Sequence, residues 1–401
     1  MGKKRLNFSA LKDYYVLRRS PPIFMSDSSI LNNAARIIKL VHAGTPADQA
    51  LRESLTLTQN RHYTAPGERR GISRAVFTYY RWWRWLGEND SLQKQLESAL
   101  ALQERFNKTP DSIKAPALAS RAVPDWLKAE IEVIPIAWLQ QLQREPTLWI
   151  RTKQGLGPKV AAALGNTTPA NLPSVGALTT AFSYSGITDL YRTDGFQSGE
   201  FEIQDLASQL VSHAAAPQPG ETWWDACAGE GGKTMHLSDL MNNKGLLWAS
   251  DRSLRRLAKL KERAARAKVF NFRTAPWEGG AKLPTKTKFD GILVDAPCSG
   301  VGTWQRNPHA RWTATPKDVQ ELAVVQRHLL ENVCHSLKPG GRLVYSVCTL
   351  TRAETTAVAD AFTAAHPELT PDPVLSNTPQ LTLWPHDLNA NGMFIAAWKL
   401  K

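Results

Sequence analysis

Hydrophobic positions near the N-terminus recur at steps of three and four residues. The recurring positions fall in the segments 31–41, 51–57, 72–86 and 92–102. Helices with one buried face need this spacing, so the pattern predicts an all-helical domain over residues 26–145, after an extension over residues 1–25.

The pattern changes twice further along the chain. Residues 146–200 are rich in Gly, Pro, Ser and Thr, and only PTLWIRTKQG predicts a short strand there, so we expect a mixed linker subdomain. From Phe201 onward, short apolar runs alternate with helical segments, which is typical of a doubly wound parallel sheet. The fold class is therefore α/β, with a Rossmann-like sheet over residues 201–401. The predicted strands are Thr222–Ala228, Leu246–Asp251, Phe270–Thr274, Phe289–Asp295 and Arg342–Thr349.

The net charge of +13 is concentrated in two regions of the chain. Residues 1–150 carry 22 Lys and Arg against 14 Asp and Glu, and residues 251–288 carry 12 against 3. Such regions attract polyanions, and RNA, DNA or an anionic surface would each be attracted by this positive charge. The alternative for residues 252–268 is the solvated face of a helix.

The run SRAVFTYYRWWRWLG mixes arginine with aromatic residues, a composition that suits RNA contact. At helical spacing most of the rings must pack inward. We therefore expect core packing for the rings and leave Arg74, Arg81 and Arg84 as the candidate RNA contacts.

Composition excludes several classes of protein. No window approaches the roughly 18 apolar residues of a membrane span, and no apolar stretch follows the basic N-terminus. The four cysteines form no CxxC pair, which argues against a disulfide framework and a structural zinc site. We expect a cytoplasmic protein with reduced thiols and no bound metal.

The first two predicted strands end in residues suited to a nucleoside cofactor. DACAGEGGKT places a glycine-rich turn between the first strand and a helix, although it matches neither GxGxxG nor the P-loop pattern. Asp251 follows Asp225 by 26 residues, near the spacing at which an acid binds a ribose hydroxyl. An equally good alternative is that Asp251 caps the next helix.

Two cysteines follow predicted strands at the edge where ligands bind. The fourth strand ends in DAPCSG and the fifth in YSVCTL, so Cys298 and Cys348 are expected to share this edge. Cys334, inside a helical segment, and Cys227 are explained by packing. Packing does not explain a thiol after Pro297, which favours chemistry for Cys298 and Cys348.

These runs together resemble the RsmB/NSUN family of S-adenosylmethionine-dependent RNA 5-methylcytosine methyltransferases. The resemblance covers most of residues 201–401, and the N-terminal half is similar to the NusB-like RNA-binding domain of the RsmB branch. The runs that carry it are FEIQDLASQLV, DACAGEGGKT, SDRSLRRL, FDGILVDAPCSGVGTWQRNP, LKPGGRLVYSVCTL and NGMFIAAWKL.

The resemblance implies a role for each candidate residue. Cys348 would be the nucleophile that adds to carbon 6 of cytosine, Asp295 would hydrogen-bond the ring near nitrogen 3, and Cys298 would assist release of the product. Pro297, Arg306 and Asn307 would shape the pocket and position the RNA, whose target base must be unstacked. The cofactor residues would be Cys227, Ala228, Gly229, Glu230, Gly231, Gly232, Lys233, Asp251, Arg256 and Asp295.

The sequence departs from the family pattern at three places. Gly229 and Glu230 replace an Ala-Pro pair, residues 274–277 lack the acid that contacts adenine in the family, with Glu278 or the face of Trp277 as its substitute, and His309 replaces an acid. The leading hypothesis is methylation of ribosomal RNA by a monomer, and the nearest variant is a tRNA substrate. The alternatives are a non-catalytic RNA-binding or ribosome-assembly factor and a different Rossmann-type methyltransferase with incidental cysteines.

Overall fold

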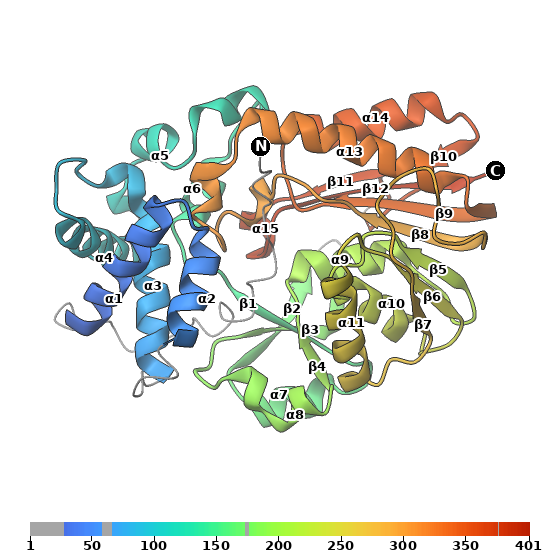
Figure 1. The fold of residues 1–401 in the computed structure, drawn as a ribbon, viewed down its shortest axis with the longest axis horizontal. Helices are drawn as coiled ribbons and strands as arrows, with labels where there is room; N and C mark the ends of the chain where they lie inside the picture. The colour runs from blue at the N-terminus through green and yellow to red at the C-terminus, as the bar shows by residue number, and fades with distance from the viewer. Residues whose placement is uncertain (1–27, 58–65, 173–175, 376) are drawn as a thin grey trace.

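The computed structural model describes residues 28–57, 66–172, 176–375 and 377–401. The expected extension over residues 1–25 lies outside these ranges. Helices from the N-terminal part lie at one end of the molecule, and a large sheet with helices on both faces lies at the other (Figure 1). Within the described ranges, none of the helices combines the length and apolar character that crossing a membrane requires.

The N-terminal part is helical, as predicted. Its α-helices are α1 (Ser28–His42), α2 (Ala47–Leu57), α3 (Pro66–Trp82), α4 (Leu92–Lys108), α5 (Ala115–Arg121) and α6 (Ile136–Leu142). Their apolar faces form one core, to which α1 contributes Ile30, Leu31, Ala34, Ile37, Ile38 and Val41. Similarity of this part to a NusB-like domain stays a prediction.

The aromatic segment of α3 faces this core. Trp82 and Tyr80 are buried, which confirms the expected packing, whereas Trp83 remains 42% exposed. The expectation that the arginines here are surface contacts is wrong for Arg81, which is 2% exposed and donates to Gln103 Oε1 at 3.0 Å. Arg74 is paired with Glu145. Because these rings are buried, an arginine on the same turn can also lie inside the core, where its charge needs hydrogen-bond or ion-pair partners.

Residues 148–203 form a small antiparallel sheet in the order β2-β3-β1-β4. Its strands are β1 (Leu148–Thr152), β2 (Thr167–Leu172), β3 (Gly176–Tyr184) and β4 (Phe201–Ile203), with α7 (Gly157–Leu164) and α8 (Asp194–Gln197) between them. The strand expected in PTLWIRTKQG is β1. Because β4 pairs with β1, this sheet extends three residues beyond the boundary expected at residue 200.

The C-terminal sheet has the order β10-β12-β9-β8-β5-β6-β7, with β11 paired to β12. The five predicted strands are present and parallel to one another. They are β5 (Thr222–Asp225), β6 (Leu246–Ala249), β7 (Phe272–Thr274), β8 (Phe289–Asp295) and β9 (Leu337–Val347). The antiparallel edge was not predicted and consists of β10 (Leu369–Pro371), β11 (Gln380–Leu383) and β12 (Met393–Leu400). The chain leaves β5 in one direction through β6 and β7, then returns to its other side as β8.

Helices cover both faces of this sheet, which confirms the doubly wound class (Figure 1). One face packs on α9 (Leu206–Ala215) and α10 (Gly232–Leu240), and the other on α13 (Pro316–Cys334) and α14 (Thr356–Ala365). Strand β8 is buried nearly throughout, as a central parallel strand must be. The remaining helices are α11 (Leu254–Arg266), α12 (Ala310–Thr313) and α15 (Pro385–Leu388).

The helical part and the sheet share a hydrophobic core. Val301, Trp304 and Leu350 follow strands of the large sheet, yet they pack in the same cluster as the N-terminal helices. The ring of Trp304 meets that of Trp126 edge to face, with centroids 6.0 Å apart. Arg311 is fully buried and donates to the carbonyl groups of Ala122 and Leu142. The two halves are therefore packed as one structural unit.

Candidate active site

A cleft of about 1660 Å³ lies at the carboxyl ends of β5 and β8. The chain continues from β5 to β6 and β7 on one side and then to β8 on the other side of β5. Open α/β sheets bind their ligands at the point where the strand order changes side in this way. Walls of the cleft also come from α11, α13 and the small sheet. Most of the residues predicted for the site line it, namely Cys227, Ala228, Gly229, Glu230, Gly232, Lys233, Asp251, Arg256, Asp295, Pro297, Cys298 and Cys348.

The loop between β5 and α10 exposes its backbone to the cleft. Gly229 and Gly231 have φ of 57° and 85°, a conformation that side chains rarely adopt. A Cβ at Gly231 would lie 2.5 Å from Leu260 Cγ, so this glycine allows α11 to pack closely. Nothing lies within 4 Å of a Cβ placed at Gly229 or Gly232. The loop therefore borders open space directly in front of the first turn of α10.

Asp251 follows β6 and faces the same loop. Its two carboxylate oxygens accept hydrogen bonds from Ser253 N at 2.7 Å and Gly229 N at 3.1 Å. Arg256 Nη1 lies 3.6 Å away. The residue that caps α11 is Ser253, whose hydroxyl accepts from Arg256 N, so the alternative role of Asp251 as the cap is wrong. Asp251 instead connects the glycine loop to the start of α11.

Asp295 ends β8 and carries the negative charge at the centre of the cleft. Lys233 Nζ donates to its Oδ2 at 2.7 Å, and Ser346 Oγ donates to its Oδ1 at 2.8 Å. Burial opposes the charge on Lys233, but the neighbouring Asp295 carboxylate raises the pKa of this lysine above its ordinary value. Lys233 was predicted to hold the cofactor, and the structure places its ammonium on Asp295.

The two predicted catalytic cysteines meet. The Sγ atoms of Cys298 and Cys348 are 3.3 Å apart, although 50 residues separate them in the chain. The hydrogen bond with Cys348, together with burial, raises the pKa of the Cys298 thiol well above its ordinary value. Cys298 therefore carries its proton at neutral pH.

The other two cysteines lie in different surroundings. Cys334 is buried in α13, and burial raises its pKa to about 11, in line with the packing role expected for it. Cys227 contributes to the cleft lining, and burial raises its pKa as well. Thiols in such surroundings are poor nucleophiles.

Sequence reasoning missed Glu354, which joins the two cysteine loops. Its carboxylate accepts hydrogen bonds from Ser299 N at 2.8 Å, Thr351 Oγ1 at 2.8 Å and Gln326 Nε2 at 3.0 Å. Ser299 Oγ also donates to it. Ser299 follows Cys298 directly, and Thr351 lies three residues after Cys348, so one carboxylate ties both loops. A lone glutamate after a strand gives no sequence signal of this role.

The predicted substrate contacts have different surroundings. Arg306 is 3% exposed and donates to Asp205 Oδ2 at 2.7 Å, so the expectation that it positions the RNA is not supported by its burial. Asn307 Oδ1 accepts from Ala310 N at the start of α12. The ring of His309 packs on Tyr80 of α3 at 4.7 Å. His309 therefore lies between the two halves of the molecule, Arg306 binds Asp205 and Asn391 of the cleft lining, and Pro297 borders the cleft.

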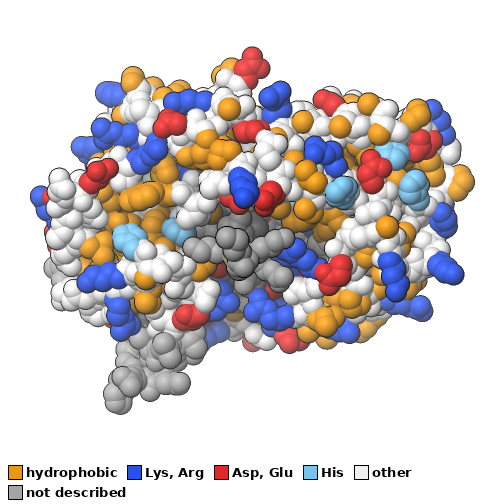
Figure 2. Space-filling model, turned by 45° about the horizontal axis from the view of Figure 1, so that its top comes forward, with side chains coloured by type: hydrophobic (Ala, Val, Ile, Leu, Met, Phe, Trp, Pro, Cys, Tyr) orange, Lys and Arg blue, Asp and Glu red, His pale blue; other side chains and the backbone are white. Residues whose placement is uncertain are grey.

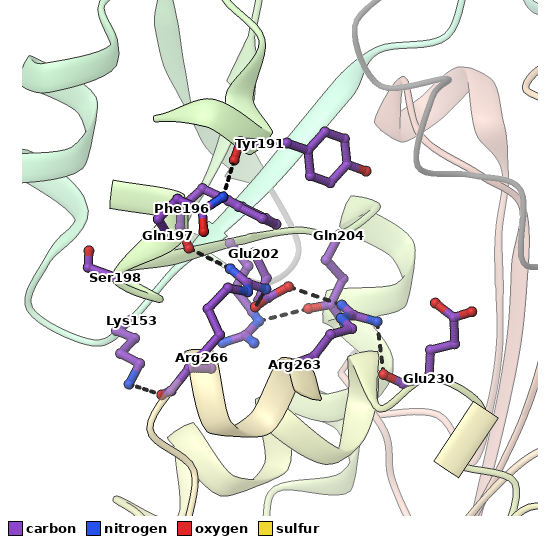
Figure 3. Close-up of polar contacts among 12 residues, drawn as sticks. Lys153, Tyr191, Phe196, Gln197, Ser198, Glu202, Gln204, Glu230, Arg263 and Arg266 are labelled. Atoms are coloured by element: carbon purple, nitrogen blue, oxygen red, sulfur yellow. Dashed lines mark hydrogen bonds and ion pairs between the residues drawn. The ribbon is translucent and has the colours of Figure 1, made fainter. Parts of the chain in front are cut away.

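Two arginines of the basic helix α11 form ion pairs with the small sheet. Figure 3 shows Arg263 and Arg266 converging on Glu202 of the small sheet, with Arg263 Nη2 3.0 Å from its Oε2. Arg263 also donates to the carbonyl of Glu230 at 2.9 Å, and the guanidinium of Arg266 lies 3.8 Å from the Phe196 ring centroid. This face of α11 therefore ties the small sheet to the glycine loop.

Lys and Arg are spread over one face of the molecule. Figure 2 shows them interspersed with Asp and Glu there. Among the described residues, no group of three His, Cys, Asp or Glu side chains is arranged to hold a metal.

Comparison with known proteins agrees with this geometry. The model of the family described as 16S rRNA methyltransferase RsmB/F matches residues 212–399. The C-terminal domain of this chain belongs to the RsmB/F methyltransferase family. A relative from Synechocystis, named probable ribosomal RNA small subunit methyltransferase B, is 35% identical over 307 residues, which are 69% of this chain and 66% of the relative. This chain thus spans just under two thirds of that relative's length.

Two solved structures show the same fold over a larger share of the chain than the family model matches. The crystal structure of PH0851 covers 95% of this chain and 99% of its own, with a TM-score of 0.71 and 22% identity. The structure of NSun6 from Pyrococcus horikoshii with SFG covers 66% of this chain and 93% of its own, with a TM-score of 0.56 and 21% identity. The arrangement of a large sheet joined to an N-terminal part is therefore shared with the first of these proteins.

Proposed function

We propose that this RsmB/F-type protein methylates carbon 5 of a cytosine in RNA, with S-adenosylmethionine as the methyl donor. The observation that carries the proposal is the 3.3 Å approach of the Cys298 and Cys348 thiols beside Asp295. A cytosine C5 transfer needs a nucleophile, a group that stabilises the charged ring and a second group that assists release. Ribosomal RNA is the proposed substrate, because the family model and the Synechocystis relative are both described by it.

The glycine-loop end of the cleft fits S-adenosylmethionine. The space in front of Gly229 and Gly232 lets a ligand reach the backbone, and Asp251 retains lone pairs that would accept from ribose hydroxyl groups. Trp277 and Glu278 line the cleft beyond Asp251, and we assign them to the adenine side in place of the family's acid. When bound there, S-adenosylmethionine supplies the methyl group.

Cys348 is proposed to activate the base. Its thiolate would add to carbon 6 of the cytosine, forming a carbon–sulfur bond and pushing an electron pair toward carbon 5 and nitrogen 3. The Asp295 carboxylate would accept a hydrogen bond from the 4-amino group beside nitrogen 3, and Lys233 would bring positive charge to the end of the ring where negative charge develops. Carbon 5 then becomes nucleophilic enough to accept a methyl group.

Cys298 is proposed to release the product. After transfer, carbon 5 carries both the methyl group and a hydrogen, and loss of that proton restores the C5–C6 double bond while the C6–S bond breaks. Cys298 carries a proton that it can give to the departing sulfur of Cys348, and its own thiolate can take the proton from carbon 5. Both thiols are then protonated, and Cys348 returns to the thiolate by releasing one proton, equal to the one lost from carbon 5, to solvent.

The competing hypotheses predict different outcomes. A non-catalytic assembly factor has no need of two adjoining thiols in the cleft, and incidental cysteines would not be expected within 3.3 Å of each other. A tRNA substrate would use the same chemistry and differ only in the labelled RNA.

The test is transfer of labelled methyl from S-adenosylmethionine to total RNA by the wild type, Cys348→Ala and Cys298→Ala, followed by nuclease mapping. We expect 5-methylcytosine in ribosomal RNA with the wild type and none with Cys348→Ala. A covalent adduct with RNA containing 5-fluorocytosine should form in the wild type, because the fluorine cannot leave as a proton does. RNA binding without labelling or adduct would instead favour the assembly factor.

A further inference from the structure

Both cysteine loops continue into the core of the helical half. Val301 lies three residues after Cys298, and Leu350 lies two residues after Cys348, and both are buried among the N-terminal helices. Each loop therefore has one end in the large sheet and the other in the helical half. Because packed cores resist small shifts, movement of the helical half would be transmitted to the thiols.

A polar contact from the helical half reaches the same place. The backbone carbonyl of Glu130 accepts from Arg352 N at 3.1 Å, and its side-chain Oε2 accepts from Ala353 N at 2.9 Å. Arg352 and Ala353 belong to the turn Arg352–Glu354. The side chain of Glu130 thus binds the turn that presents the Glu354 carboxylate.

The chain of contacts runs from one half of the molecule to the reacting atoms. Glu130 holds the turn, the turn presents Glu354, and Glu354 binds Ser299 beside Cys298 and Thr351 after Cys348. We propose that Glu130 is a positioning residue, through which the helical half sets the separation of the Cys298 and Cys348 thiols. The activity part of this inference rests on the proposed function, whereas the thiol geometry does not.

Three variants separate this role from general stability. Glu130→Ala removes the side-chain acceptor, whereas Glu130→Gln keeps an oxygen that can accept from Ala353 N. The matched control is Glu132→Ala, which removes the same charge from an exposed position two residues away. All assays are run well below the unfolding midpoint of each variant, so that every sample is folded.

The first readout needs no RNA. Diamide takes up two electrons and two protons as Cys298 and Cys348 form a disulfide, and peptide mass spectrometry measures the rate at which this pair forms. We expect Glu130→Ala to lower that rate about 10-fold, because displacement of a reacting group by about 1 Å has effects of this size or larger. Glu130→Gln and Glu132→Ala should match the wild type.

The second readout is methyl transfer. Glu130→Ala should lower kcat about 10-fold and leave KM for S-adenosylmethionine unchanged, since the glycine loop is untouched. Equal disulfide rates in Glu130→Ala and Glu132→Ala would overturn the proposal, as would failure of Glu130→Gln to restore the rate. If the wild type transfers no methyl group, the proposed function fails and the disulfide rates still decide the role of Glu130.

Discussion

The two ends of the cleft are built from different distances along the chain. At the cofactor end, Gly229 N reaches Asp251 across 22 residues, within one strand–helix–strand unit. At the cysteine end, Ser299 reaches Glu354 across 55 residues, and Ala353 reaches Glu130 across 223. A glycine loop is therefore specified locally, whereas a pair of thiols needs a scaffold assembled from distant parts of the chain.

Removal of the nucleophile should abolish the reaction at the cysteine end and leave the cofactor end intact. Cys348→Ala should lower methyl transfer by at least about 10³-fold, because no other group in the cleft replaces the covalent step. Binding of S-adenosylmethionine, measured by calorimetry, should stay within about twofold of the wild type, since a conservative change at the cysteine end leaves Gly229 and Asp251 in place. A variant that still forms the 5-fluorocytosine adduct would assign the nucleophile elsewhere.

Removing the central carboxylate at the cysteine end should affect stability and rate together. Glu354→Ala removes the acceptor of the buried Ser299 N–H and one of the two acceptors of Gln326 Nε2, so the free energy of unfolding should fall by about 3 kcal/mol. We expect kcat to fall about 100-fold in the folded fraction. Urea denaturation and initial rates measure the two effects, with Glu97→Ala on the exposed face of α4 as the control. Unchanged kcat would show that Glu354 does not position the thiols.

A substitution at the cofactor end should weaken cofactor binding and leave the reaction of the two thiols unchanged. Asp251→Ala should raise KM for S-adenosylmethionine about 10- to 100-fold, because charge-assisted hydrogen bonds contribute about 1.5–3 kcal/mol. The rate at which diamide joins Cys298 to Cys348 should remain that of the wild type. Loss of the thiol reaction in this variant would mean that the two ends are not independent.

Two buried histidines in the helices next to the cofactor end should make the stability of the protein depend on pH. His213 of α9 and His236 of α10 lie with ring centroids 5.0 Å apart, and burial lowers the pKa of both below the ordinary 6.5. The unfolded chain then binds more protons than the folded one below pH 6.5, so stability is lost as pH falls through that value.

We expect His236, whose pKa lies well below its ordinary value, to contribute roughly 1 kcal/mol of this loss between pH 6.5 and 5.5. Denaturation at the two pH values should show a smaller loss for His236→Phe than for the wild type. An equal loss in both proteins would place the titrating group elsewhere.

Local pattern was sufficient for most of the fold. Short apolar runs predicted the five parallel strands from β5 to β9, and helical spacing predicted the packing of Trp82 and Tyr80. The antiparallel edge was missed because its strands pair across the sheet and their pattern alone does not identify a partner. Arg81 and Arg306 were expected to contact RNA, since a sequence shows a charge without showing the Gln103 or Asp205 that binds it.

Local sequence pattern was enough to predict the order of elements, the glycine turn and the two cysteines at strand ends, because each depends on neighbours within one strand–loop–helix unit. Tertiary structure alone decided that the thiols lie 3.3 Å apart, that Lys233 pairs with Asp295 and that Glu354 joins both loops. It also decided that Glu130 of the helical half reaches that turn. The physical reason is that burial selects hydrogen-bond partners by distance in space, and folding brings together residues whose separation along the chain carries no local signal.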